Sequence, residues 1–336
     1  MASSDVSRLL LDAEWLAHRY DPQQDAFQYR RVPRSQHRSV PFLTDEYLGE
    51  EPAPIVVGSS DASALAPPPA PIHFIFHSAY CASTMLLRAL DVPGSAMGLS
   101  EPVILNDLVG WQRRGADARR HGALLDGVLR QLARPFAPGE AVVVKPSNVF
   151  NGLVMGTMSL LPQSRAVLLY SPLPEFLLSV ARKGLWCRLW ARELLEGMLQ
   201  DGLVDLGFEP SDFFRQSDLQ VAAVGWLAQQ ALFGVLARKF GPERIASLDS
   251  ETLTRSPSAT VAKAARHLRL PEASYEAHPA YLRNSKSGSD FATGERQDDQ
   301  KRAYQAHGEE IDMVVTWTNA VAKQAGVTMT LPYPLG

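Results

Sequence analysis

The sequence predicts an α/β domain over residues 72–336, with a mostly parallel sheet flanked by helices. Two observations support this fold class. Short continuous apolar runs, of the kind buried on both faces of a parallel sheet, recur along the chain. Longer segments with apolar residues at helical spacing separate these runs, and such alternation is typical of a sheet covered by helices on both faces.

The strands and helices of this domain are predicted in order. Four apolar runs are predicted strands: IHFIF (72–76), AVVVK (141–145), RAVLLY (165–170) and RIASLD (244–249). Predicted helices cover 85–91, 116–133, 148–161, 174–200, 211–240, 256–269 and 308–325. The helix at 85–91 is expected to stop at the Pro-Gly pair that follows it.

Residues 1–71 are predicted to form an N-terminal head and a proline-rich connector. The head, residues 1–50, is expected to be irregular apart from a short helix over 7–20 with Leu10, Leu11, Trp15 and Leu16 on its apolar side. Residues 51–71 contain EPAP and ALAPPPAP, and this composition indicates an extended segment poor in tertiary contacts. The predicted boundary with the α/β domain lies at residue 71.

Composition narrows the class of protein. The chain has 33 basic and 36 acidic residues, a formal net charge of -3, so nucleic acid is not an expected partner. Its two cysteines, Cys81 and Cys187, give neither a disulfide framework nor metal-ligand spacing, and no metal site is predicted. The N-terminus resembles no signal peptide, and no segment reaches the roughly 20 apolar residues that span a bilayer. A cytoplasmic protein without a membrane span is expected.

A loop between the first predicted strand and the first predicted helix is the candidate ligand site. Its sequence is HSAYCAST, from His77 to Thr84. A loop that leaves a parallel strand and enters a helix directs backbone N–H groups at one point, and the helix dipole there favours an anion. The sequence is not the G-x-x-x-x-G-K-[ST] loop of ATP- and GTP-binding proteins. An ordinary turn capped by Ser83 is the alternative interpretation.

Residues 72 to about 296 resemble the sulfotransferases that use 3′-phosphoadenosine 5′-phosphosulfate (PAPS), which have a P-loop-like fold. The resemblance begins with IHFIFHSAYCASTMLLRALDVPGSAMGLSEPVILNDL, similar to the family's strand, phosphosulfate loop and helix. RAVLLYSPLPEFLLSVAR and IASLDSETLTRSPSATVAKAARHLRLPEA are similar to later segments, and LRNSKSGSDF is similar to a basic loop that closes over the 3′-phosphate. The resemblance implies a sulfuryl transfer from PAPS to a hydroxyl acceptor, a small molecule.

The resemblance assigns roles residue by residue. It implies that Glu101 is the general base and that Lys145 stabilises the sulfuryl group. The residues it implies for the donor are Ser78, Ala79, Tyr80, Cys81, Ala82, Ser83 and Thr84 in the loop, and Ser171, Ser179, Arg283 and Lys286 around the 3′-phosphate. The chain departs from the family pattern at Tyr80 and Ser171, which stand where the family has arginine.

Each catalytic assignment has a structural alternative. Glu101 suits the start of a helix, and Lys145 suits the exposed end of a strand. His77 is a further candidate base or oxyanion donor, or else a hydrogen-bonded structural residue. Two other functions stay open: a non-catalytic descendant that binds a nucleotide or a partner, and a transferase with another phosphorylated donor. The stripe Trp186, Leu189, Trp190 and Leu194 is expected to pack in the core or in a homodimer.

Overall fold

The computed structural model describes residues 3–49, 52–276, 278–281 and 295–335. Its centre is a five-stranded parallel sheet in the order β5-β6-β4-β7-β8. The bounds of the strands are β4 Ile72–His77, β5 Ala96–Ser100, β6 Ala141–Lys145, β7 Ala166–Tyr170 and β8 Ile245–Asp249. The α/β fold and the four predicted strands are confirmed. β5 was not predicted, because AMGLS contains Gly98 and no β-branched residue.

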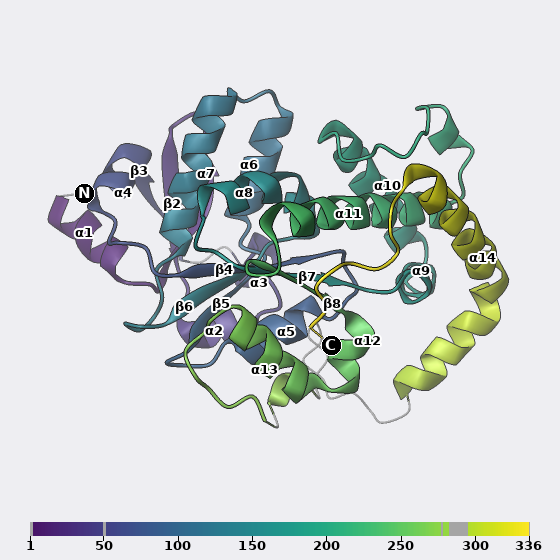
Figure 1. The fold of residues 1–336 in the computed structure, drawn as a ribbon. Coiled ribbons are helices and arrows are strands. Elements are labelled where there is room, and N and C mark those ends of the chain that lie inside the picture. The colour runs from purple at the N-terminus through teal and green to yellow at the C-terminus, as the bar shows by residue number, and fades with distance from the viewer. Residues whose placement is uncertain (1–2, 50–51, 277, 282–294, 336) are drawn as a thin grey trace.

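Helices cover both faces of this sheet (Figure 1). Phe74 and Phe76 of β4 belong to one core, together with apolar residues of helices on one side, whereas Ile75 belongs to a second core on the other side. Successive side chains of a strand point to opposite faces, so each face of β4 contributes to a different core. The second core includes residues of α5 (Ser83–Leu90) and α13 (Pro257–His267).

The connections between the strands reverse direction at β4, and such a reversal is where ligands bind in open α/β sheets. The chain leaves β4 through α5 and returns to the edge strand β5, on one side of β4. From β6 the chain crosses to β7, on the other side of β4. Loops that leave neighbouring strands in opposite directions open a ligand-binding crevice at the carboxyl ends of the strands.

The remaining helices follow the predicted order, with several differences in their number and bounds. α6 was not predicted, and the helix predicted over 174–200 is divided by Gly184, whose φ of +70° starts a new helix. The bounds are α6 Ile104–Arg113, α7 Ala118–Leu132, the 3₁₀ helix η1 Asn148–Leu153, α8 Val154–Leu160, α9 Leu173–Arg182, α10 Leu185–Gln200, η2 Asp212–Phe214, α11 Asp218–Phe240, α12 Ser250–Arg255, η3 Pro279–Tyr281 and α14 Glu295–Ala325.

The N-terminal head is not irregular. It forms a three-stranded antiparallel sheet of β1 Trp15–Asp21, β2 Ala26–Arg31 and β3 Ile55–Gly58, with α1 Ser3–Leu11, α2 Arg34–Ser39 and α3 Asp45–Leu48. The predicted helix over 7–20 is wrong beyond Leu11. The turn between β1 and β2 contains Pro22 and Asp25 (φ +49°), and it pairs Tyr20 with Phe27, whose ring centroids are 5.4 Å apart. Such a turn between two apolar runs is a hairpin signal.

The predicted connector is extended only in part. Residues 55–58 form β3, which pairs with β2, and Ser59–Leu65 form α4. The prediction of few tertiary contacts is wrong for 55–65, because buried Val57 and Ala62 pack in the first core, and the prediction of an extended backbone is wrong for α4. Residues 66–71, with three consecutive prolines, form neither helix nor strand. The domain boundary at residue 71 stays a prediction.

Among the described helices, α11 is long and apolar enough to cross a membrane by length and composition. Of its most apolar 18-residue window, 78% is buried inside the protein. Its side chains, including fully buried Trp226 and Phe233, pack between other helices and the sheet. The helix has the burial of a core helix.

Candidate functional site

The carboxyl ends of three strands bring together three predicted catalytic residues. His77 ends β4, Lys145 ends β6, and Glu101 directly follows β5. β5 and β6 are paired so that Ser100 lies beside Lys145, and the backbone N–H of Glu101 donates to the Lys145 carbonyl at 2.7 Å. The parallel register therefore places residues that are 24 and 44 positions apart in one crevice.

Glu101 and Lys145 form an ion pair. The Lys145 ammonium donates to Glu101 Oε1. The Lys145 side chain is 0% exposed and that of Glu101 is 18% exposed. A buried ammonium is tolerated only with a partner, and the carboxylate supplies it. The alternative interpretation, in which Lys145 simply emerges into water, is wrong, and the accessible member of the pair is the carboxylate.

An aromatic ring from the N-terminal head covers the same ammonium. The Lys145 Nζ atom lies 5.1 Å from the centroid of the Phe42 ring, within the range of a cation–π contact. Phe42 was not predicted as a site residue. Its sequence neighbourhood, SVPFLTDEY, carries no catalytic motif, and only the tertiary fold brings it beside β6.

His77 is held neutral by its surroundings. Its Nδ1 accepts from the Ala79 N–H at 3.2 Å, so Nε2 carries the proton and donates to the Pro146 carbonyl at 3.0 Å. Burial, and secondly the charge of Lys145, lower the pKa of His77 well below its usual value of 6.5. Nε2 lies 3.9 Å from Glu101 Oε1. Because backbone groups occupy both ring nitrogens, His77 connects the loop to the strand ends.

The loop after β4 has an unusual backbone. Ala79, Tyr80 and Ala82 have φ values of +73°, +50° and +63°, and Glu101 across the crevice has +48°. Left-handed conformations at residues other than glycine cost about 1–3 kcal/mol each and concentrate at functional sites. Consecutive turns of this kind form a concave row of N–H groups that binds anions.

The start of α5 continues this concave loop. Ala82 is the N-cap of α5, and among the described residues no side chain caps the helix. The predicted ligand residues Ser78, Ser83 and Thr84 are buried beside it. An uncapped helix N-terminus adds partial positive charge where the loop N–H groups converge. The alternative interpretation, in which Ser83 caps an ordinary turn, is wrong, because the N-cap is Ala82.

Tyr80 contacts the α9–α10 turn. Its hydroxyl lies 3.0 Å from the Cys187 Sγ, and its ring packs edge-on against Trp190 with centroids 5.5 Å apart. The Lys183 ammonium lies 4.8 Å from the centroid of the same ring. The Tyr80 ring thus contacts the ammonium of Lys183, which lies at the end of α9, beside the loop that follows β4. Cys81, next in sequence, is fully buried, and burial raises the pKa of its thiol to about 11.

The described positions assigned to the 3′-phosphate are neutral. Ser171 is buried at the end of β7, where its carbonyl accepts from Trp226 Nε1 at 2.8 Å and its hydroxyl accepts from Ser250 at 3.4 Å. Ser179 is half-buried on α9. Between them in sequence lies Glu175, whose pKa is raised by burial and by the charge of Glu251. The predicted residues Arg283 and Lys286 lie outside the described residues.

The aromatic stripe of α10 is only partly in the core. Leu194 is buried and Trp190 packs against the core, whereas Trp186 and Leu189 are 63% and 51% exposed. The prediction of core packing therefore holds for one half of the stripe. In the part of the chain that the structure describes, no group of three or more His, Cys, Asp or Glu side chains is arranged to hold a metal ion.

No protein-family model and no curated protein matches the chain. Among solved structures, the chain is similar to the "Sulfotransferase Domain from the Curacin Biosynthetic Pathway", with 16% identity, a TM-score of 0.44, and coverage of 79% of this chain and 99% of that chain. It is also similar to the "Sulfotransferase Domain from the Synechococcus PCC 7002 Olefin Synthase", with 15% identity, a TM-score of 0.40, and coverage of 68% and 81%. The roles of individual residues rest on the geometry above.

Proposed function

We propose that this chain is a sulfotransferase that moves a sulfuryl group from PAPS to a hydroxyl acceptor. The observation that supports this most is the Glu101–Lys145 ion pair beside an anion-binding loop, at the carboxyl ends of parallel strands. A base and a cation at one point are the groups that such a transfer needs, since it depends on positioning and on charge stabilisation.

The residues at the loop fit the phosphosulfate end of the donor. The backbone of residues 80–82 and the N-terminus of α5 would hold its oxygens through N–H groups. The small side chains of Ala79 and Ala82 allow close approach to that backbone. PAPS, when bound, supplies an activated sulfuryl group. The positive charge of the covered Lys145 ammonium would then stabilise the oxygens on which negative charge develops.

Glu101 is the proposed general base. A hydroxyl group that reaches the accessible Glu101 carboxylate loses its proton to it as the hydroxyl oxygen attacks sulfur. The ammonium of Lys145 holds that carboxylate in position before the acceptor arrives. His77 is proposed as a positioning residue, because its ring links the Pro146 carbonyl to the Ala79 N–H and so fixes the loop relative to β6.

A transferase with a donor that lacks a 3′-phosphate is the second candidate. The observation that favours it is the set of neutral Ser171 and Ser179 together with the Glu175 carboxylate, which gives a 3′-phosphate no cation among these three. A non-catalytic nucleotide-binding protein is the third. The loop backbone is common to all three candidates.

Two measurements separate these functions. Isothermal titration with 3′-phosphoadenosine 5′-phosphate, the spent donor, should show binding, and ³⁵S-labelled PAPS should label an alcohol acceptor. Binding without any transfer across a panel of alcohols, phenols and sugars would favour the non-catalytic protein. A folded protein that binds no 3′-phosphoadenosine 5′-phosphate, but binds adenosine 5′-phosphosulfate, would favour the second candidate.

A further inference from the structure

We propose that residues 41–48 of the N-terminal head form the acceptor-side wall of the site, and that Phe42 and Tyr47 select an alcohol or phenol carried on an uncharged apolar body. This acceptor wall, as we call residues 41–48, rests on the proposed function, since it defines the substrate of that reaction. The argument uses three sets of contacts.

The acceptor wall is joined to the strand that carries the proposed base. The Leu43 N–H donates to the Ser100 carbonyl at 2.7 Å, and the Val103 N–H donates to the Leu43 carbonyl at 3.1 Å. The Ser100 hydroxyl also donates to the Pro41 carbonyl at 2.6 Å. These bonds lie on both sides of Glu101, so the chain at Leu43 runs beside the proposed base.

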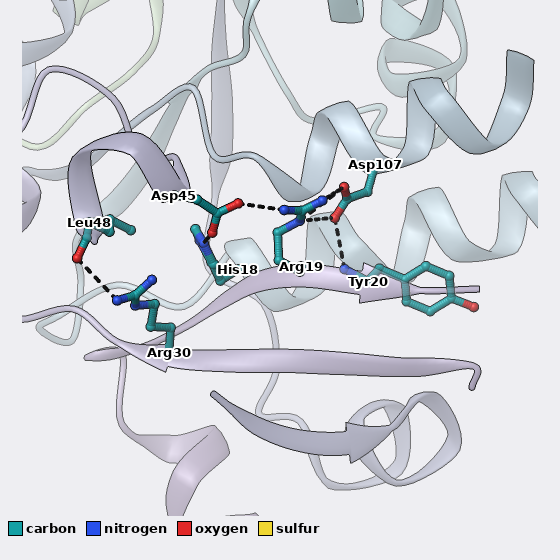
Figure 2. A network of polar contacts seen from close by, with 7 residues as sticks. All are labelled: His18, Arg19, Tyr20, Arg30, Asp45, Leu48 and Asp107. Atoms are coloured by element: carbon teal, nitrogen blue, oxygen red, sulfur yellow. Dashed lines mark hydrogen bonds and ion pairs between the residues drawn. The ribbon is translucent and has the colours of Figure 1, made fainter. Parts of the chain in front are cut away.

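The far end of the wall is fixed by a network of charged side chains (Figure 2). Asp45, the first residue of α3, accepts from His18 Nε2 and from Arg19 Nη1, both at 2.6 Å. Arg19 also makes a bidentate hydrogen-bonded ion pair with Asp107 of α6. At the end of α3, Arg30 donates to the Leu48 carbonyl at 3.2 Å. The wall is thus held from β1, β2 and α6, and side chains on it are preorganised.

One aromatic side chain of the wall lies over the ion pair, and a second packs against the first. Phe42 lies over the Lys145 ammonium at 5.1 Å, and the Phe42 and Tyr47 rings pack edge-to-face with centroids 5.6 Å apart. Burial is the main cause that raises the pKa of Tyr47, and the charges of Glu46 and Glu101 contribute.

Exposure shows where an acceptor meets these residues. Lys145 is fully covered, whereas Glu101, Phe42 and Tyr47 are each partly accessible. A hydroxyl that reaches the Glu101 carboxylate from solvent has these two aromatic rings beside it. Aromatic surface stabilises an apolar body next to the hydroxyl. The exposed carboxylate of Glu46 on the same wall disfavours an anionic acceptor.

The experiment uses 1-naphthol as acceptor, with glucose and an acidic tyrosine peptide as polar and anionic comparisons. Phe42→Leu and Tyr47→Ala should each raise KM for 1-naphthol about tenfold, the effect of losing about 1.4 kcal/mol of apolar contact. Tyr47→Phe, which keeps the ring, should have the same KM for 1-naphthol as wild type. Phe214→Ala is the control, because Phe214 on η2 is 89% exposed, and KM should not change.

Equilibrium binding of 1-naphthol, measured calorimetrically with 3′-phosphoadenosine 5′-phosphate present, separates this proposal from the proposed function. If no acceptor is sulfated, but wild type binds 1-naphthol and Tyr47→Ala does not, the wall is a ligand site and only the reaction is wrong. The proposal is overturned if both variants keep the wild-type KM and affinity. It is also overturned if wild type binds no 1-naphthol, or uses glucose or the acidic peptide in preference to it.

Discussion

Glu101 and Lys145 are joined twice, once by their backbones across the β5–β6 pair and once by the ion pair of their side chains. The backbone bond of 2.7 Å holds Glu101 at a φ of +48°, a conformation that a glutamate rarely adopts. Strain of this kind persists only where the surrounding structure enforces it. The parallel register of two strands therefore fixes the separation between the proposed base and the proposed cation.

Replacing the cation tests its role in charge stabilisation. Lys145→Ala should lower turnover on the order of 10²-fold, since loss of one preorganised donor typically has this effect. Steady-state kinetics with PAPS and 1-naphthol measures it. Lys239→Ala, at the exposed carboxyl end of α11, is the matched control and should leave turnover unchanged. Wild-type turnover in Lys145→Ala would remove Lys145 from the site.

The network that anchors α3 should contribute to stability. Asp107 is 13% exposed and accepts from Arg19 and from the Tyr20 N–H at 3.1 Å. Asp107→Ala should lower the free energy of unfolding by about 2–3 kcal/mol, because charge-assisted hydrogen bonds are lost. Asp126→Ala, which removes an exposed pair with Arg130, should lower it by about 0.5 kcal/mol at most. Equal losses in a urea titration would contradict the assignment.

Stability should fall in mild acid because histidines are buried neutral. Burial, followed by the charges of Arg165 and His267, lowers the pKa of His73 to about 4. The unfolded chain binds this proton near pH 6.5 and the native state does not, so the free energy of unfolding falls as pH drops from 6.5 toward 4. His73→Gln should reduce this slope by about 1.4 kcal/mol per pH unit. A slope unchanged between pH 6 and 5 would show that His73 titrates normally.

The predicted boundary at residue 71 is tested by limited proteolysis. Residues 66–71 form neither helix nor strand, whereas 55–65 lie in β3 and α4. The first cleavage between the head and the α/β domain should therefore fall within or next to 66–71, at a site without regular structure. First cuts inside β3 or α4, read by mass spectrometry of the fragments, would place the boundary elsewhere.

The strands that could be predicted from the sequence are those whose own residues form a continuous apolar run. The apolar runs of β4, β6, β7 and β8 are continuous, so their periodicity identified them. β5 was not predicted, because AMGLS has little strand propensity of its own. Its burial depends on contacts with β6 and with the acceptor wall. Glu101 and Lys145 were found through the family resemblance. Phe42 and Tyr47 were not, because the contact of Phe42 with Lys145 joins residues far apart in the sequence and leaves no local signal.

The most direct measurement of the central claim is sulfuryl transfer by Glu101→Gln. The amide keeps the size of the side chain but cannot accept the proton of the acceptor hydroxyl. Transfer from ³⁵S-labelled PAPS to 1-naphthol should be nearly abolished, while the affinity for 3′-phosphoadenosine 5′-phosphate, measured by titration, should stay close to wild type. A Glu101→Gln protein that transfers sulfate at the wild-type rate would contradict the account.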